Sequence, residues 1–422
     1  MKKYDELYNT IKKEITTEQL LPGAKLPSVR KAAAIYGVSR TTVQNAYFAL
    51  AADGFIISEP QSGYYNAYKK AKETDKKQNN SKNNILYDFK SGNADKNSFE
   101  FNLWRRYMKN ALRQDKKLLS YGEVQGEYEL RDVLSDYIRE KRNVTSSPNR
   151  IVIGTGHQSL LGVLCSLIDE KGTVSFPDKS FIQGASLFDD YGFEVKYRYK
   201  DADIIYVSPS HMNKRGDVMP NKRRIELVDY SSKNGSLIIE DDYESDFQYS
   251  GTPAPSLHAL TGGENVIYIS SFSNLLLPSI RISFMVLTEE LAEKYENEIY
   301  KYNQTAGKTE QIALAQYIRD GHLKAQIRKT RRFYTAKTKA FSVLLANEFK
   351  NAEIEISENA LKIIMSIPFN KSMDIFEKNG ISVLIESYEN GILKMILNPS
   401  AVPQDMFYEA VKALKSALGN NE

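Results

Sequence analysis

A lysine- and asparagine-rich stretch divides this chain into two parts that must fold separately. Residues 68–84 read YKKAKETDKKQNNSKNN, with six lysines, two acidic residues and no large aliphatic side chain. Because such a segment buries too little apolar surface to offset the conformational entropy lost on ordering, it predicts a flexible, solvated linker. A charged surface helix is the weaker alternative, since Asn and Ser crowd the second half. We therefore expect one domain over residues 1–67 and a second over residues 85–422.

The composition of the chain is typical of a soluble globular protein. Of its 422 residues, 41% are hydrophobic and 26% are charged, which excludes a collagen-like or wholly disordered chain. Cys165 is the only cysteine, so no internal disulfide can form. With no run of about 18 apolar residues and a polar N-terminus, we expect no membrane segment, no signal peptide and a cytoplasmic location. Four histidines and one cysteine are too few and too scattered to predict a metal site.

The small excess of positive charge is concentrated at the N-terminal end. The chain has 57 Lys and Arg against 53 Asp and Glu, a net charge of +4. The first 70 residues hold ten basic and six acidic residues, so they carry this entire excess. A basic small domain beside a neutral body indicates that the small domain contacts nucleic-acid phosphates.

Three helices are expected in the N-terminal domain. The first ends at the breakers of residues 21–23. Ser28 can cap a second helix over residues 29–36, and Ser39 can cap a third over residues 40–52. The side chains expected on the core side of the first helix are Tyr4, Leu7, Ile11 and Ile15, and those of the third are Val43, Tyr47, Leu50 and Ala51.

A hairpin completes a winged helix-turn-helix. Its apolar first strand lies at residues 55–58, and its turn ends at Gly63. DNA sequence is read by a helix that presents polar side chains to the major groove, and the third helix directs Arg40 and Gln44 outward. We therefore expect a double-stranded DNA operator as partner, contacted by Lys25, Ser28, Arg30, Ser39, Arg40, Thr41, Thr42, Gln44 and Gly63. For a single residue such as Gln44, a merely solvated position stays an open alternative.

The C-terminal segment alternates short apolar runs with helical stretches, which indicates an α/β fold with a mainly parallel sheet flanked by helices. One helix is expected over residues 158–168, and a smaller α+β subdomain over about 340–422. The strands are expected at residues 150–154, 172–176, 203–207, 236–240 and 266–269.

Several of these motifs carry a family resemblance. Leu26-Pro27-Ser28-Val29-Arg30 and Gly37-Val38-Ser39-Arg40-Thr41-Thr42-Val43 resemble the GntR-type winged helix. The remainder resembles the aminotransferase-like half of MocR-type regulators, which join a GntR winged helix to a fold-type I domain of pyridoxal phosphate (PLP) enzymes. This resemblance implies a DNA-binding regulator that forms a head-to-tail homodimer and whose large domain senses a small-molecule effector.

The resemblance also implies a set of PLP-binding residues. Asp241 takes the place of the aspartate that pairs with the pyridinium nitrogen, Phe181 that of the stacking aromatic ring, and Arg281 that of the phosphate anchor. A helix-capping role for the acidic cluster around Asp241 is the alternative interpretation. The full set implied by the resemblance is Gly156, His157, Gln158, Phe181, His211, Asp241, Tyr243, Ser271, Ser273, Asn274 and Arg281.

Asn274 stands where the family pattern has its reactive lysine, and no lysine occurs from Val266 to Arg281. An amide nitrogen is not a nucleophilic amine and cannot form the covalent link to PLP, so we expect no catalytic residues and no transaminase activity. Three alternatives follow for the pocket. It holds PLP non-covalently, it binds a preformed PLP–amino acid adduct or another anion, or it binds nothing.

Lys394 stands in the strand that carries the effector-carboxylate arginine in aminotransferases, and it can replace that arginine as a point charge. A surface lysine is an equally good interpretation.

Taken together, the sequence predicts a ligand-sensing transcriptional regulator. One alternative is a PLP-dependent enzyme with an accessory DNA-binding arm, which Asn274 disfavours. The other is a constitutive DNA-binding dimer with a purely structural large domain.

Overall fold

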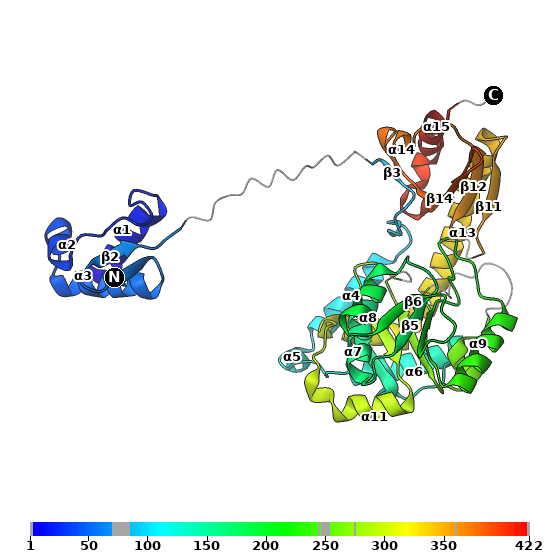
Figure 1. Ribbon diagram of the computed structural model, residues 1–422, viewed down its shortest axis with the longest axis horizontal. Coiled ribbons are helices and arrows are strands. Elements are labelled where there is room, and N and C mark those ends of the chain that lie inside the picture. Colours follow the sequence, from blue (N-terminus) through cyan, green and yellow to red (C-terminus); the bar gives the residue numbers. More distant parts are fainter. Residues whose placement is uncertain are drawn as a thin grey trace. The chain divides into compact units, whose positions relative to one another are not determined.

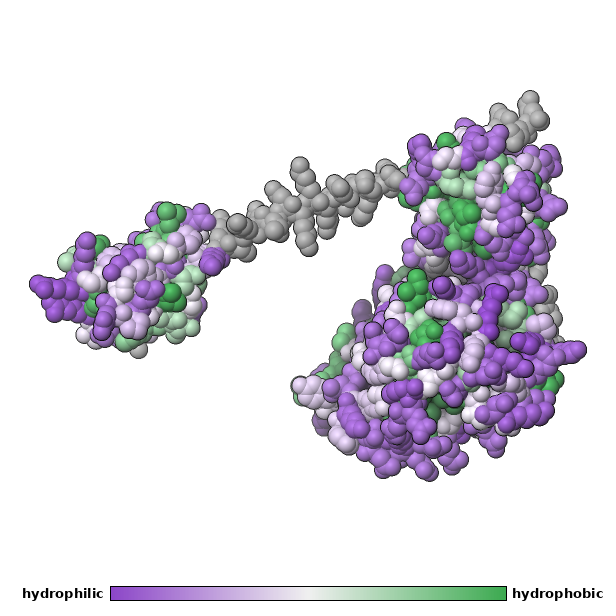
Figure 2. Space-filling model, in the orientation of Figure 1, coloured by the Kyte–Doolittle hydropathy of each residue, from purple (hydrophilic) through white to green (hydrophobic). Residues whose placement is uncertain are grey.

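The computed structural model describes residues 3–69, 85–243, 245, 254–273, 276–358 and 361–419. The chain divides into two compact units, Met1–Ser81 and Lys82–Glu422 (Figure 1). Of the predicted linker, only Tyr68 and Lys69 are among the described residues. Hydrophilic residues cover most of the face of each unit that Figure 2 presents. No described helix is both long and apolar enough to cross a lipid bilayer.

The N-terminal unit is the winged helix-turn-helix that the sequence predicts. Its core is formed by Leu7, Ile11 and Ile15 of the first helix together with Val43, Tyr47 and Leu50 of the third, whereas Tyr4 and Ala51 are only half-buried. Ile56 is buried, but Ile57 is 50% exposed, so the first strand of the hairpin is covered on one face only. The elements are α1 (Lys3–Thr16), α2 (Val29–Tyr36), α3 (Arg40–Ala52), β1 (Ile56–Glu59) and β2 (Gly63–Asn66), with β1 and β2 antiparallel.

The caps that define α2 and α3 are formed by the two serines that the sequence singles out. Ser28 Oγ accepts a hydrogen bond of 3.3 Å from the backbone N–H of Lys31, and Ser39 Oγ accepts one of 3.1 Å from that of Thr42. Between the helices, Gly37 has φ +62°, a left-handed conformation that favours glycine. The turn between α2 and α3 is therefore set by local sequence.

The large unit is built around a seven-stranded sheet of order β4-β10-β9-β8-β7-β5-β6. All neighbours are parallel except β10, which is antiparallel to both β4 and β9. The five predicted strands are present, whereas β6 and β10 were not anticipated. The strands are β4 (Ile151–Gly154), β5 (Thr173–Phe176), β6 (Glu194–Tyr197), β7 (Ile204–Val207), β8 (Leu237–Asp241), β9 (Val266–Ser271) and β10 (Ser283–Val286).

Helices cover both faces of this sheet. One face packs Val152, Ile267 and Met285 against α7 (His157–Leu167), α8 (Ile182–Asp190) and α11 (Glu289–Asn297). The other packs Ile153 and Phe284 against α4 (Phe101–Leu112), α6 (Tyr128–Arg142) and α12 (Lys308–Arg319), and continues under α9 (Asn221–Asn234) and α10 (Leu257–Thr261). The predicted layered α/β architecture is confirmed. Shorter helical segments are α5 (Asp115–Leu118) and the 3-10 turns Pro148–Arg150, Ile299–Lys301, Pro399–Ala401 and Gln404–Met406.

A small subdomain follows the sheet domain and has its own apolar core. Its antiparallel sheet has the order β11-β12-β15-β14, and a two-stranded parallel sheet pairs β3 (Tyr87–Asp88) with β13 (Ile381–Ser382). The subdomain therefore also includes residues from the start of the described large unit. Its other elements are α13 (His322–Glu348), β11 (Glu353–Ile356), β12 (Ile363–Pro368), α14 (Ile375–Lys378), β14 (Leu384–Glu389), β15 (Ile392–Leu397) and α15 (Phe407–Leu418).

Candidate functional site

The outward face of α3 carries most of the residues predicted to read DNA. Arg40, Thr41 and Gln44 are exposed on it, as expected for side chains that enter a groove. Thr42 differs, because it is half-buried and its Oγ1 lies 2.8 Å from Ser39 Oγ within the cap. Thr42 and Ser39 therefore serve first to start the helix.

The remaining predicted DNA residues lie on α2 and the wing. Arg30 and Ser28 are exposed at the start of α2. Lys25 pairs through its backbone with Tyr65 of β2, and its Nζ lies 5.6 Å from the centre of the Tyr65 ring. Gly63 has φ +113°, and a Cβ there would lie 3.5 Å from Lys25 Cε, so the glycine and the lysine adjoin on the wing.

A cavity of about 510 Å³ opens in the large unit at the carboxyl ends of the parallel strands. Ligands of open α/β sheets bind at this edge. Gln158 and Lys394, although predicted, do not line it, and Asn274 lies outside the described residues. Nine predicted residues line it: Gly156, His157, Phe181, His211, Asp241, Tyr243, Ser271, Ser273 and Arg281.

The carboxylate of Asp241 is held from two sides. His157 Nε2 lies 2.8 Å from Asp241 Oδ1, and Tyr206 Oη donates a hydrogen bond of 2.5 Å to Oδ2. Burial lowers the pKa of His157, but the charge of Asp241 and the hydrogen bond to it outweigh this effect and leave the pKa above its ordinary value, against opposition from Arg281. Tyr206 was not predicted. It lies two residues after Ile204 and therefore on the same buried face of β7, and this spacing was a usable signal.

The neighbouring acidic residues have structural roles. Glu240 accepts hydrogen bonds of 2.8 and 2.9 Å from the backbone N–H groups of Leu257 and His258, so it caps α10. Asp242 forms a buried ion pair of 2.7 Å with Arg142. The helix-capping interpretation of this cluster thus holds for Glu240, whereas Asp241 faces the cavity.

One end of the cavity is suited to an anion. Gly156 precedes α7 with φ +92°, and a Cβ there would lie 2.7 Å from Arg281 Nη2, so the guanidinium approaches the backbone where α7 begins. Arg281 is exposed and makes no ion pair within the described part of the chain. An uncompensated guanidinium beside free helix N–H groups is a strong anion site. Ser271 and Ser273 lie close by, with their Oγ atoms 3.4 Å apart.

Aromatic rings and additional lysines complete the cavity wall. The ring centres of Phe181 and Tyr206 are 5.2 Å apart, and those of His211 and Tyr243 are 5.1 Å apart. Lys362, directly before strand β12 of the small subdomain, reaches across so that its Nζ lies 3.3 Å from His211 Nε2. No sequence pattern pointed to Lys362, because only packing between the subdomains brings it here. Cations on the wall outnumber acids: Lys90, Lys214, Arg281 and Lys362 stand against Asp178 and Asp241.

Two predicted residues are directed elsewhere. Gln158 follows His157 in the first turn of α7 and is exposed, because successive helical residues point in different directions. Lys394 Nζ lies 3.8 Å from Glu386 Oε2, and Arg215 holds the same carboxylate with bonds of 2.6 and 2.9 Å. The structure therefore gives Lys394 an internal carboxylate as partner.

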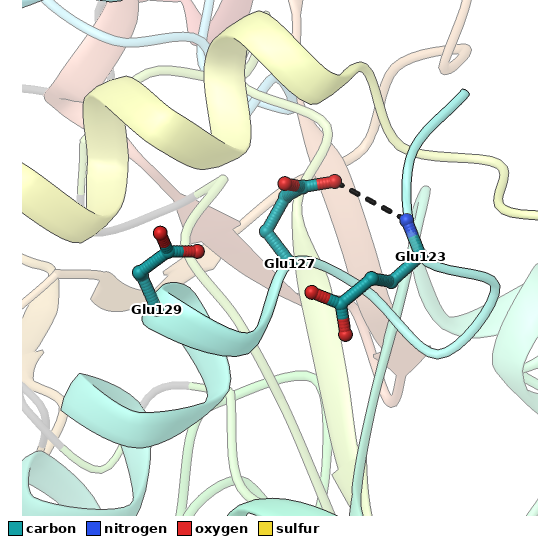
Figure 3. A group of neighbouring side chains, drawn as sticks. All are labelled: Glu123, Glu127 and Glu129. Carbon is teal, nitrogen blue, oxygen red and sulfur yellow. Dashed lines mark hydrogen bonds between the residues drawn. The ribbon is translucent and has the colours of Figure 1, made fainter. Parts of the chain in front are cut away.

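Three carboxylates outside the cavity lie together. Oxygens of Glu123, Glu127 and Glu129 are all within 4.8 Å of one another, and Glu127 accepts a hydrogen bond of 3.2 Å from the backbone N–H of Glu123 (Figure 3). Each also has a cation nearby. The partners are Arg131 for Glu123 at 2.7 Å, Lys308 for Glu127 at 3.9 Å and Lys117 for Glu129. The chain itself thus balances the charge of this group.

Comparisons with known proteins agree with both halves of the structure. Residues 3–65 match the family described as bacterial regulatory proteins, gntR family, and residues 84–205 match aminotransferase class I and II. The HTH-type transcriptional regulator YdeL of Bacillus subtilis (strain 168) is 31% identical over 98% of this chain and 96% of its own length. The chain belongs to the HTH-type transcriptional regulators of the GntR family.

Two further comparisons define the class of this regulator. The probable rhizopine catabolism regulatory protein MocR of Rhizobium meliloti is 25% identical over 87% of this chain and 82% of its own length. The crystal structure of an archaeal alanine:glyoxylate aminotransferase superposes with a TM-score of 0.68 at 21% identity, covering 80% of this chain and 91% of that one, which shows the fold. The protein is thus a DNA-binding regulator with an aminotransferase-like domain.

Proposed function

We propose that the aminotransferase-like domain senses PLP, or an adduct of PLP, held without a covalent bond. The observation that carries this proposal is the placement of two complementary groups in one cavity. Arg281 and the start of α7 offer an anion site, and Asp241 offers a carboxylate fixed by His157 and Tyr206. A phosphorylated pyridine has a dianion and a protonatable ring nitrogen to match them.

The residues present fit this cofactor. The absence of a Cβ at Gly156 leaves room for the guanidinium of Arg281 to approach the helix start. Phe181 supplies an aromatic ring on the wall of the cavity, suited to stacking on a flat ligand. PLP supplies an aldehyde and an electron-accepting ring when bound, but Asn274 offers no amine at the family's lysine position. Binding without transamination follows.

The test is a PLP titration of the full-length protein followed by borohydride reduction. We expect saturable binding, a rise in unfolding temperature, and no increase in protein mass after reduction. Arg281→Gln should weaken binding, whereas Arg332→Gln, which removes an exposed arginine from α13, should not. Absence of saturable binding contradicts the ligand. A stoichiometric reduced adduct on one lysine of the cavity wall, formed after unbound PLP has been removed, contradicts the non-covalent mode and favours an enzyme. Lys90, Lys214 and Lys362 on the wall make this worth testing directly.

The sensor would act through a homodimer. Large apolar side chains are exposed along the segment from α4 to α6: Leu112 is 57% exposed, Leu119 89%, Tyr121 fully and Tyr128 49%. Exposed apolar clusters of this kind are typical of protein interfaces. Two winged helices in one dimer read two half-sites, and a ligand that favours one arrangement of the dimer changes operator affinity. Lys25, Arg30, Arg40, Thr41 and Gln44 are the residues proposed to contact the operator.

A further inference from the structure

One connection in the parallel sheet lacks the helix that such connections usually carry. Strands β6 and β7 are both parallel to β5, which lies between them. Only residues 198–203 join β6 to β7. A crossover between parallel strands usually takes a dozen or more residues and contains a helix, as α8 does between β5 and β6 and α9 between β7 and β8. The space beside the sheet that a crossover helix would normally fill is therefore left without a helix.

The handedness of crossovers tells on which face this volume lies. The chain moves toward the sheet edge from β5 to β6 and back again from β6 to β7 to β8. Because crossovers are right-handed, the short connection belongs on the face of α9, opposite to α8. Figure 1 shows α8 and α9 on opposite sides of β5 and β6. The uncovered surface is thus the part of the sheet beside α9.

A second cavity, of about 730 Å³, lies at this place. Ile205 and Val207 of β7 form its floor, Leu227 and Tyr230 of α9 form one wall, and Tyr199 of the short connection lies across it. Tyr230 Oη donates a hydrogen bond of 2.6 Å to the backbone oxygen of Lys200, which ties the connection to α9. The cavity is therefore bounded by β7, by α9 and by the short connection between β6 and β7.

The lining of the second cavity specifies a chemical class of ligand. Two aromatic residues on the α9 side line it, Tyr199 and Tyr230, beside the apolar floor of Ile205 and Val207. At the rim, Arg223 pairs with Glu226 at 3.6 Å, whereas the ammonium of Lys200 forms no ion pair or hydrogen bond with the rest of the described chain. Flat aromatic walls favour a planar ligand, and an uncompensated cation at the rim favours a negative charge on it.

We propose that this second cavity binds a planar aromatic anion. The two cavities adjoin, because the same residues after β5 and β7 line both: Pro177, Asp178, Tyr206, Ser208, Met212 and Asn213. A ligand in one site would therefore lie beside a wall of the other. The proposal stands apart from PLP sensing, because it rests on the missing crossover helix and on residues that line the second cavity but not the first, among them Tyr199, Lys200 and Leu227.

The experiment is a calorimetric titration of the full-length protein with naphthalene-2-sulfonate, a planar aromatic anion. We expect one saturable site. Leu227→Trp, which fills the cavity, should raise the Kd about tenfold. Leu187→Trp is the matched control, because Leu187 is an equally half-buried leucine on α8, on the opposite face. Far-UV circular dichroism of each variant establishes that it is folded.

A charge variant decides the question if Leu227→Trp fails to fold. Lys200→Glu, at an exposed position, should also raise the Kd, while Lys233→Glu on α9 should leave it unchanged. Phe181→Ala tests the first cavity, which alone contains Phe181. No saturable binding, a Kd that Lys200→Glu leaves unchanged, or a site abolished by Phe181→Ala but not by Lys200→Glu would each overturn the proposal.

Discussion

His157 and Tyr206 each contact one oxygen of the same carboxylate. His157 Nε2 lies 2.8 Å from Asp241 Oδ1, and Tyr206 Oη lies 2.5 Å from Asp241 Oδ2. The carboxylate is thereby oriented before any ligand arrives. A histidine from the start of a helix and a tyrosine from a strand on the other side of the acid fix its position. This arrangement has consequences that can be measured in solution.

The pKa of His157 should lie above its ordinary value, and Asp241→Asn should bring it down. Because the pKa is raised in the folded state, the stability that His157 contributes is present in full below the pKa of an unfolded histidine and is lost as the pH rises through the folded pKa. NMR titration of the four histidine rings measures this, with His157→Gln assigning the signal. A His157 pKa that Asp241→Asn leaves unchanged would contradict the pairing.

His258 should behave in the opposite way. Burial lowers its pKa to about 4, and neither ring nitrogen has a hydrogen-bond partner among the described residues. Its contribution to stability is therefore present above the unfolded pKa of about 6.5 and is lost as the pH falls toward 4, a change of roughly 3 kcal/mol in the free energy of unfolding. His258→Phe should reduce the difference between urea midpoints at acidic and neutral pH. His322→Phe, at a half-exposed position, serves as control and should not.

Arg40→Ala should weaken specific DNA binding by about 1–3 kcal/mol if its guanidinium contacts a base. The measurement is a fluorescence anisotropy titration with DNA selected by the protein from a random pool. Lys13→Ala removes an exposed cation from α1 and should have a smaller effect at the same salt concentration. Equal losses for the two variants would mean that Arg40 contributes only general electrostatics.

Asn274→Lys should convert non-covalent into covalent PLP binding. The substitution supplies an amine directly after Ser273, which lines the cavity. We expect a visible absorption band on adding PLP and a mass increase after borohydride reduction, neither of which the natural chain should give. Failure of the variant to form the adduct, while it still binds PLP, would show that position 274 is not directed at the ligand.

Leu119→Asp should shift the protein from dimer to monomer. Leu119 is 89% exposed, so a charge there does not disturb the fold of one subunit but opposes burial between two. Sedimentation velocity measures the change. Ile225→Asp on α9, at a position that is 52% exposed, is the matched control and should leave the mass unchanged. A monomeric natural protein would contradict the proposed dimer outright.

Local signals made most of the fold predictable. Ser28 and Ser39 cap the helices that they were expected to cap, because N-caps depend only on neighbouring residues. The buried strands were visible as apolar runs. Strand β6 was missed because its residues, EVKY, form no continuous apolar run and lie at the sheet edge, where burial leaves little pattern.

The candidate site was predictable only where a motif was continuous in sequence. The segments around Gly156, Asp241 and Ser271 converge because the carboxyl ends of parallel strands meet at one edge. Lys362 depends instead on how the small subdomain packs against the sheet domain, which no local pattern encodes. The partner of Lys394, Glu386, lies on the neighbouring strand β14 of the small subdomain and depends on the pairing of β14 with β15. The second cavity required the topology of the whole sheet, since a short connection is notable only when both its strands are known to be parallel.

The point at which the chain enters the large unit matters for signalling. The described part of this unit begins at Ile85, and β3 at Tyr87–Asp88 is fastened to β13 of the small subdomain, while Phe89 and Lys90 directly after it line the first cavity. The segment leading to the winged helix is thus tied to the small subdomain. If the proposed ligand displaces that subdomain, the anchor of the linker at Tyr87–Asp88 moves with it, because Phe89 and Lys90 of the cavity wall follow it directly in the chain.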